Sequence, residues 1–212
     1  MGRTSDAKDK ILNAAQELME RRGYSDLGVA EICKVAGVPK GSFYYFFDSK
    51  ETLALAVLDE HWHAQRADWQ RVLGDDGEPP LDRLRRLFTQ TEAGLQAGQR
   101  SCGTISGCMF GNLTLELSNR TAPIRERLQE IFDAQAQMVE EVVAQAQVRG
   151  EATVADTHEA ARSVVAQLEG QVLFAKLYNS TQRLDTLWAN CQALLGAASG
   201  RAAEAEAEPV GV

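Results

Sequence analysis

The fold is decided by the stretch Ala36-Gly37-Val38-Pro39-Lys40-Gly41-Ser42-Phe43-Tyr44-Tyr45-Phe46-Phe47-Asp48-Ser49-Lys50-Glu51. Its five consecutive aromatic residues are typical of a β-strand by propensity alone. No second strand-like run lies within hairpin reach, however, and an isolated strand would leave its backbone groups unpaired. We therefore predict a short helix, with Phe43 and Phe47 on its buried side and Tyr44 and Tyr45 on its outward side.

Helical patterns also precede and follow this stretch. Residues 5–22 carry apolar side chains at helical spacing, and residues 28–36 carry a second, shorter pattern. Gly37 is suited to end that second helix in a left-handed conformation. Beyond the aromatic residues, a further helix is expected to start at Asp48 or Ser49 and to run to about residue 73. Two short helices joined by a tight turn, packed under a first amphipathic helix, place a recognition helix in a DNA major groove about 12 Å wide.

The rest of the chain is helical as well, so we predict an all-α fold of about nine helices. The remaining helices are expected over residues 81–98, 109–117, 124–150, 157–177 and 183–198. Three regions follow: a helix-turn-helix DNA-binding domain over residues 1–50, a ligand-sensing and dimerisation domain over residues 51–198, and a disordered acidic tail over residues 199–212.

Composition limits what the protein can bind and where it acts. The 212-residue chain has a net charge of −8, but residues 1–50 carry 8 basic and 7 acidic side chains, so the N-terminal region is the plausible DNA-binding face. The longest unbroken apolar run of the chain, residues 53–58, is far shorter than the roughly 20 residues of a membrane span. The N-terminus has no secretion signal, and the four cysteines have no Cys-x-x-Cys spacing. We expect a cytoplasmic protein with free thiols and no membrane contact.

Residues 11–51, above all the stretch quoted first, resemble the DNA-binding domain of the TetR/AcrR family of one-component repressors. Lys40 supplies positive charge, and the small residues Gly41 and Ser42 let the recognition helix approach base edges. The two tyrosines can reach phosphate oxygens, and so can the ammonium group of Lys50. At Gly28 the family often has a threonine that caps the second helix and touches phosphate. The resemblance assigns DNA contacts to these positions: Gly28, Lys40, Gly41, Ser42, Tyr44, Tyr45 and Lys50.

One such unit contacts few phosphates, so useful affinity requires two units on one double-stranded operator. We therefore expect a homodimer on a palindromic operator. The apolar faces of the last two predicted helices, residues 157–177 and 183–198, would pair in a four-helix interface, which is also where the family dimerises. The alternative is that both faces only fill the core of their own chain.

A candidate sensing site lies around Cys108, which falls where a glycine-rich loop becomes a helix. A helix N-terminus and a nearby cation both favour a reactive thiolate. Lys176 is the only lysine after residue 50 and lies in an apolar segment, which predicts partial burial, although the side chain can also extend to the surface. Cys102 is a candidate resolving thiol. The bland alternative for Cys108 is a small buried hydrophobic residue.

The Gly-Thr-Ile-Ser-Gly-Cys run that ends at Cys108 and the segment around Lys176 are similar to a branch of the same family that answers reactive electrophiles and oxidants. That branch includes repressors of N-ethylmaleimide reductase and of acrylate metabolism. The resemblance implies a repressor released by a small-molecule effector acting near Cys108. The alternatives are a repressor that binds a small carboxylate or apolar molecule reversibly and, more remotely, a small thiol-dependent enzyme. We expect no catalytic residues, no cofactor and no metal site.

Overall fold

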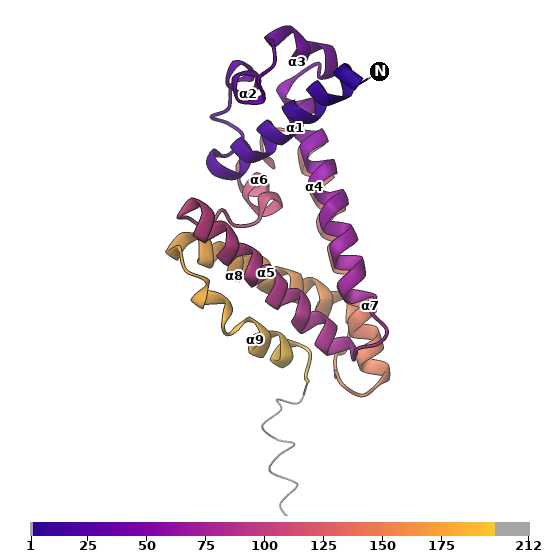
Figure 1. Ribbon diagram of the computed structural model, residues 1–212. Coiled ribbons are helices and arrows are strands. Elements are labelled where there is room, and N and C mark those ends of the chain that lie inside the picture. The colour runs from indigo at the N-terminus through magenta and orange to yellow at the C-terminus, as the bar shows by residue number, and fades with distance from the viewer. Residues whose placement is uncertain (1, 198–212) are drawn as a thin grey trace, which may run out of the picture. The chain divides into compact units, whose positions relative to one another are not determined.

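The computed structural model describes residues 2–197 (Figure 1). The predicted acidic tail, residues 199–212, lies outside the described residues. All regular structure within the described part of the chain is helical, so the predicted all-α class is confirmed. The elements are α1 (Gly2–Arg22), α2 (Val29–Ala36), α3 (Lys40–Phe46), α4 (Lys50–Leu73), α5 (Pro80–Cys102), α6 (Met109–Leu117), α7 (Ala122–Val148), α8 (Thr157–Tyr178), the 3-10 helix η1 (Thr181–Leu184) and α9 (Leu187–Leu194).

The aromatic stretch forms the helix α3, as predicted, and not a strand. Phe43 and Phe47 are 0% and 3% exposed, whereas Tyr44 and Tyr45 are 55% and 73% exposed. Phe46, which the prediction assigned to neither side of the helix, is half-buried. Helical geometry therefore separates the aromatic residues into two that fill the core and two that face solvent.

Helices α1, α2 and α3 pack together as a helix-turn-helix unit, and Figure 1 shows the three gathered around one another. Their shared core includes Ile11, Ile32 and Phe43, each at most 1% exposed. Gly37 ends α2 with φ 66° and ψ 32°, the left-handed conformation expected of it, in which other residues are strained. The chain then turns through Pro39, whose extended backbone starts α3.

Helix α4 begins where the sequence predicts, because Ser49 accepts a hydrogen bond at its hydroxyl from the backbone N–H of Thr52 at 3.0 Å. Helix α8 likewise begins after Asp156, whose carboxylate accepts hydrogen bonds from the N–H groups of His158 and Glu159. Both helices use a polar residue to satisfy N–H groups that have no partner inside the helix.

Two predicted helix boundaries are wrong. Helix α5 continues through Gly98 to Cys102, since one interior glycine costs only about 1 kcal/mol and the helix is anchored by a buried face. It ends at Gly103, which is left-handed with φ 77°. The last predicted helix, residues 183–198, is divided into η1 and α9, because the Ser180 hydroxyl accepts from the N–H of Gln182 and starts a separate 3-10 turn.

The chain forms two compact units. The first comprises residues 2–66 and 106–132, so that α6 and the start of α7 join the helix-turn-helix. The second comprises residues 67–105 and 133–197 of the described chain. This division by packing differs from the functional boundary expected at residue 50, which stays a prediction. Within residues 2–197, no helix has both the length and the apolar character needed to span a membrane.

Candidate nucleic-acid interface and sensing residues

The predicted base-reading residues lie together at the start of α3. Lys40 is the first residue of this helix and is exposed, and Gly41 beside it is exposed as well. A Cβ atom added at Gly41 would meet no atom within 4 Å, so the surface here is open. Ser42 is half-buried. The helix thus presents a cation, a bare backbone and a hydroxyl within three consecutive positions, which suits close approach to base edges.

The two tyrosines flank this open surface on the same helix. The ring of Tyr44 packs edge-on against Phe43 with centroids 5.2 Å apart, and the ring of Tyr45 packs edge-on against Phe46 at 4.9 Å. These contacts hold each exposed ring in one orientation, so a phenol needs little ordering to bind a phosphate oxygen. The structure therefore brings Lys40, Gly41, Ser42, Tyr44 and Tyr45 onto one short helix.

Lys50 has an internal role that the sequence analysis missed. Its Nζ donates to the backbone carbonyls of Tyr24 at 3.0 Å and Leu27 at 2.9 Å, and it lies 4.0 Å from the centroid of the Tyr24 ring. Burial lowers the pKa of this ammonium group from its ordinary value, against the charges of Glu116 and Asp26 that raise it. Its phosphate contact stays a prediction.

Gly28 occupies the position before α2, with φ −99° and ψ 144°. This is the extended conformation of a helix N-cap, so glycine is an acceptable residue here, although it brings no side chain to cap the helix or to touch phosphate.

Cys108 is the N-cap residue of α6, with φ −87° and ψ 128°, and its side chain is half-buried. Its carbonyl accepts a hydrogen bond from the N–H of Asn112 at 2.9 Å. The Asn112 amide also donates to the carbonyl of Ser106 at 2.9 Å, which fixes the preceding loop on the helix. The predicted position of this thiol at a helix N-terminus is confirmed.

Cys102 and Lys176 belong to the second compact unit, whereas Cys108 belongs to the first. Cys102 is the last residue of α5 and is exposed. Lys176 is also exposed, so of the two alternatives for this side chain, extension to the surface is confirmed and partial burial is wrong. The reason is helical register, because Val172 and Ala175 occupy the buried side of α8 and place Lys176 on the outer side.

The four cysteines should differ sharply in alkylation. Cys191 is 0% exposed, and burial raises its pKa to about 12. Cys33 is 4% exposed, and burial raises its pKa as well. Because the thiolate forms only as pH rises through the pKa, about one Cys191 in 10⁴ is ionised at pH 8. We expect iodoacetamide at pH 8 to label Cys102 first, Cys108 more slowly and the two buried thiols only after unfolding. Peptide mass spectrometry measures the order, and native labelling of Cys191 as fast as Cys102 would contradict it.

The outer face of α8 carries a cluster of exposed apolar side chains. Leu173 and Phe174 are each 47% exposed, Leu177 is 67% exposed and Tyr178 is 55% exposed. Leu194 on α9 adds another at 45%. Contiguous apolar surface of this kind marks an interaction site.

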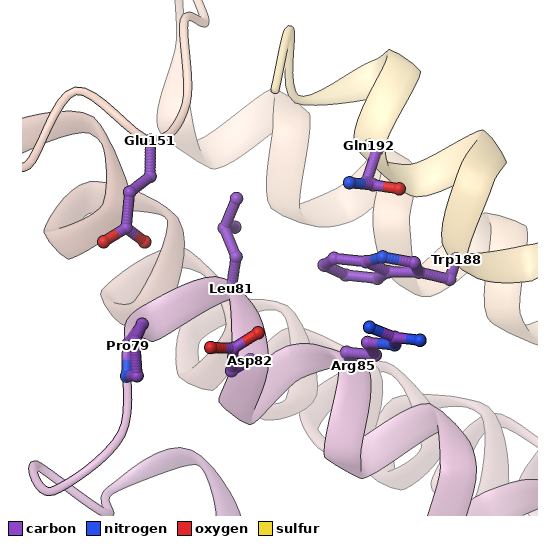
Figure 2. Close-up of a pocket in the computed structure, with 7 residues that line it drawn as sticks. All are labelled: Pro79, Leu81, Asp82, Arg85, Glu151, Trp188 and Gln192. Atoms are coloured by element: carbon purple, nitrogen blue, oxygen red, sulfur yellow. The ribbon is translucent and has the colours of Figure 1, made fainter. Parts of the chain in front are cut away.

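The second unit contains an open cavity of about 540 Å³ where the start of α5 meets α9 (Figure 2). Figure 2 shows the indole of Trp188 above the guanidinium of Arg85, the carboxylate of Glu151 on the other side of Leu81 and the carboxylate of Asp82 below Leu81. No pattern in the sequence predicted this cavity. None of the three predicted sensing residues lines it.

No group of three or more His, Cys, Asp or Glu side chains within residues 2–197 is placed to hold a metal ion. His158 instead accepts or donates a hydrogen bond at 2.9 Å to Glu140, which raises the pKa of the imidazole.

A short helix with an exposed cation, small residues and two oriented phenols, held by a glycine-containing turn, defines a DNA-binding protein of the helix-turn-helix class. Residues 11–57 match the bacterial regulatory proteins of the tetR family, and residues 80–191 match the tetracyclin repressor-like C-terminal domain. The chain belongs to the TetR family of transcription regulators and is not an enzyme.

Individual relatives support this assignment. The chain is 32% identical over 147 residues to the HTH-type transcriptional repressor NemR of Escherichia coli strain K12, covering 68% of this chain and 69% of the relative. It is 32% identical over 174 residues to the transcriptional regulator AcuR of Cereibacter sphaeroides, covering 81% and 77%. The crystal structure of reduced E. coli NemR superposes with a TM-score of 0.82 at 25% identity, covering 92% of this chain and 99% of that one.

Proposed function

We propose that the protein is a homodimeric repressor that leaves its palindromic operator when a small electrophile or oxidant acts at Cys108. The observation that carries this proposal is the place of Cys108 at the N-cap of α6, inside the compact unit that also contains the helix-turn-helix. The similar protein NemR is a repressor, and its solved structure is described as a reduced form. The proposal places the protein in the cytoplasm, where thiols are kept reduced.

Two copies of the chain would pair through the exposed apolar face of α8 and the adjacent α9. The pairing would cover Phe174 and Leu177, which water otherwise surrounds. A symmetric dimer presents two α3 helices, and the major groove repeats every 34–36 Å or so along one side of DNA. A change of a few ångströms in the separation of these helices would therefore lose one half-site.

The thiol chemistry would be addition to an unsaturated carbonyl compound. The Cys108 thiolate forms a C–S bond at the β-carbon, the π electrons move to the carbonyl oxygen, and the resulting enolate takes a proton from water. Cys108 is the N-cap residue of α6, and the positive end of a helix dipole favours the thiolate that starts this reaction. The adduct would enlarge a half-buried side chain at the N-terminal end of α6, and we infer that the added volume displaces this end of the helix. The resulting movement would pass to α4, the helix that leads out of the DNA-binding unit.

A reversibly bound effector is the second candidate, because the cavity in Figure 2 has a size typical of small-molecule sites. Its aromatic wall at Trp188 and the cation of Arg85 suit an apolar molecule that carries one acidic group. Lys176 does not line this cavity, so its role as a carboxylate partner would require a different site.

The experiment that separates the two candidates is footprinting of the gene's own upstream region with purified protein, before and after treatment with acrolein. We expect a protected palindrome with two chains bound, and loss of protection together with the mass increase of one acrolein on the peptide that contains Cys108. Loss of protection without a covalent mass increase at Cys108 would favour the reversible effector. Absence of any protected sequence would contradict the repressor proposal at that operator.

A further inference from the structure

The turn between α1 and α2 is held from two sides by side chains of opposite charge. The carboxylate of Glu116, on α6, accepts hydrogen bonds from the backbone N–H groups of Tyr24 at 2.9 Å and Ser25 at 2.5 Å. The ammonium of Lys50, on α4, donates to the carbonyls of Tyr24 and Leu27. The carboxylate of Glu116 therefore binds N–H groups of the turn, and the ammonium group of Lys50 binds its carbonyl groups. Both side chains contact the segment that leads directly into α2.

The contact at Glu116 is charged and closely fitted. Burial opposes its ionisation, yet hydrogen bonds from Ser25 and Tyr24 and the charge of Arg120 lower the pKa of Glu116 below its ordinary value. The guanidinium of Arg120 also donates to the Ser25 hydroxyl at 3.1 Å. Gly23 leaves room for the carboxylate, because a Cβ atom there would lie only 2.9 Å from Oε2 of Glu116. Its φ of 80° also lies in the left-handed region that favours glycine.

Helix α6 connects this contact to Cys108. Cys108 precedes the first residue of the helix and Glu116 is the residue before its last, a span of about 12 Å. Between them, the ring of Phe110 is fully buried and packs edge-on against His61 at 5.2 Å and Trp62 at 6.2 Å, both on α4. A helix this short moves as one body, and a shift of about an ångström lengthens a 2.9 Å hydrogen bond beyond its useful range.

From these contacts we propose that Glu116 is a positioning residue through which α6 controls the turn that leads into the helix-turn-helix, so that a change at Cys108 loosens the α1–α2 turn. The identity of Cys108 as the sensor rests on the function proposed above, whereas the link between Cys108 and the turn does not. Glu116 is the only charged residue in an otherwise mostly apolar helix, which is the sequence signal for it.

The test is hydrogen exchange at the Tyr24 and Ser25 amides, measured by NMR on the full chain. Glu116→Gln should exchange there about tenfold faster than wild type, because charged acceptors make the stronger hydrogen bonds. Cys108→Trp, which adds bulk without any thiol reaction, should speed the same two amides. In the double variant the two effects should not add, since both act by removing one contact. The wild-type adduct with N-ethylmaleimide provides a second perturbation of Cys108 if the tryptophan variant does not fold.

Glu126→Gln is the matched control, because this exposed acid lies on α7 of the same unit and should leave both amides unchanged. Unchanged exchange at Tyr24 and Ser25 after both perturbations of Cys108 would overturn the inference, as would fully additive effects with Glu116→Gln. Operator release by acrolein without any change at the two amides would contradict the link between Cys108 and the turn and would support the proposed function. Faster exchange at the two amides without operator release would support that link and contradict the proposed function.

Discussion

Lys40→Ala is expected to weaken operator binding by a factor of about 10² to 10⁴. A hydrogen bond from a charged group contributes about 1.5–3 kcal/mol, and a dimer loses the contact twice. Lys40 is exposed at the start of α3, so its removal leaves no cavity and should not unfold the chain. Fluorescence anisotropy with a labelled operator measures the affinity, and circular dichroism checks the fold.

Salt dependence shows whether Lys40 binds phosphate. Each phosphate contact changes the slope of log K against log salt by about 0.9, so the variant dimer should show a slope shallower by about 2. Arg71→Ala is the matched control, because this exposed arginine lies near the far end of α4 and pairs with Asp68. Unchanged affinity in Lys40→Ala would mean that α3 is not the recognition helix. Weaker binding with an unchanged salt slope would mean that Lys40 contacts a base edge and not a phosphate.

The sequence was most informative where local chemistry decides structure. Burial of Phe43 and exposure of Tyr45 follow from helical periodicity alone, once isolated strands are excluded for lack of pairing partners. The left-handed turn at Gly37 and the cap at Ser49 follow from the conformational and hydrogen-bonding properties of single residues. These features together account for the helix-turn-helix and for the placement of its solvent-facing side chains.

Long-range contacts set the limit of that reasoning. Glu116 is separated from Tyr24 by 92 positions in the chain, and no local pattern pairs them. Lys50 is a second case of a long-range contact that no local pattern predicts. A cation at a helix start predicts an anionic ligand, whereas the ammonium group of Lys50 donates to two backbone carbonyls in the structure. The apolar neighbours of Lys176 could not decide between burial and extension to the surface, because one step of helical register separates the buried Ala175 from this exposed side chain.

Cys108→Ser is expected to bind the operator as wild type does, within about twofold, and to lose release by acrolein. Coupling between two sites in a regulator is typically 5–150-fold, so treated wild type should bind at least about fivefold more weakly than untreated, and the variant should show no change. Serine is favoured at N-caps, so this substitution should preserve α6 or even stabilise it. The hydroxyl is not ionised near neutral pH and does not add to the unsaturated carbon.

Cys102→Ser separates the two thiols. This exposed residue ends α5 and should be alkylated readily, so labelling alone does not make it a sensor. If Cys108 is the site of action, Cys102→Ser should still be released by acrolein to the wild-type extent. Cys102 would be identified as the resolving thiol by two results together: hydrogen peroxide releases neither variant, and acrolein fails to release only Cys108→Ser. The reason is that a disulfide needs two sulfurs, whereas an alkyl adduct needs one. Equal release of Cys108→Ser and wild type would contradict a role of this thiol in release. The remaining candidate would then be an effector that binds reversibly in the second unit.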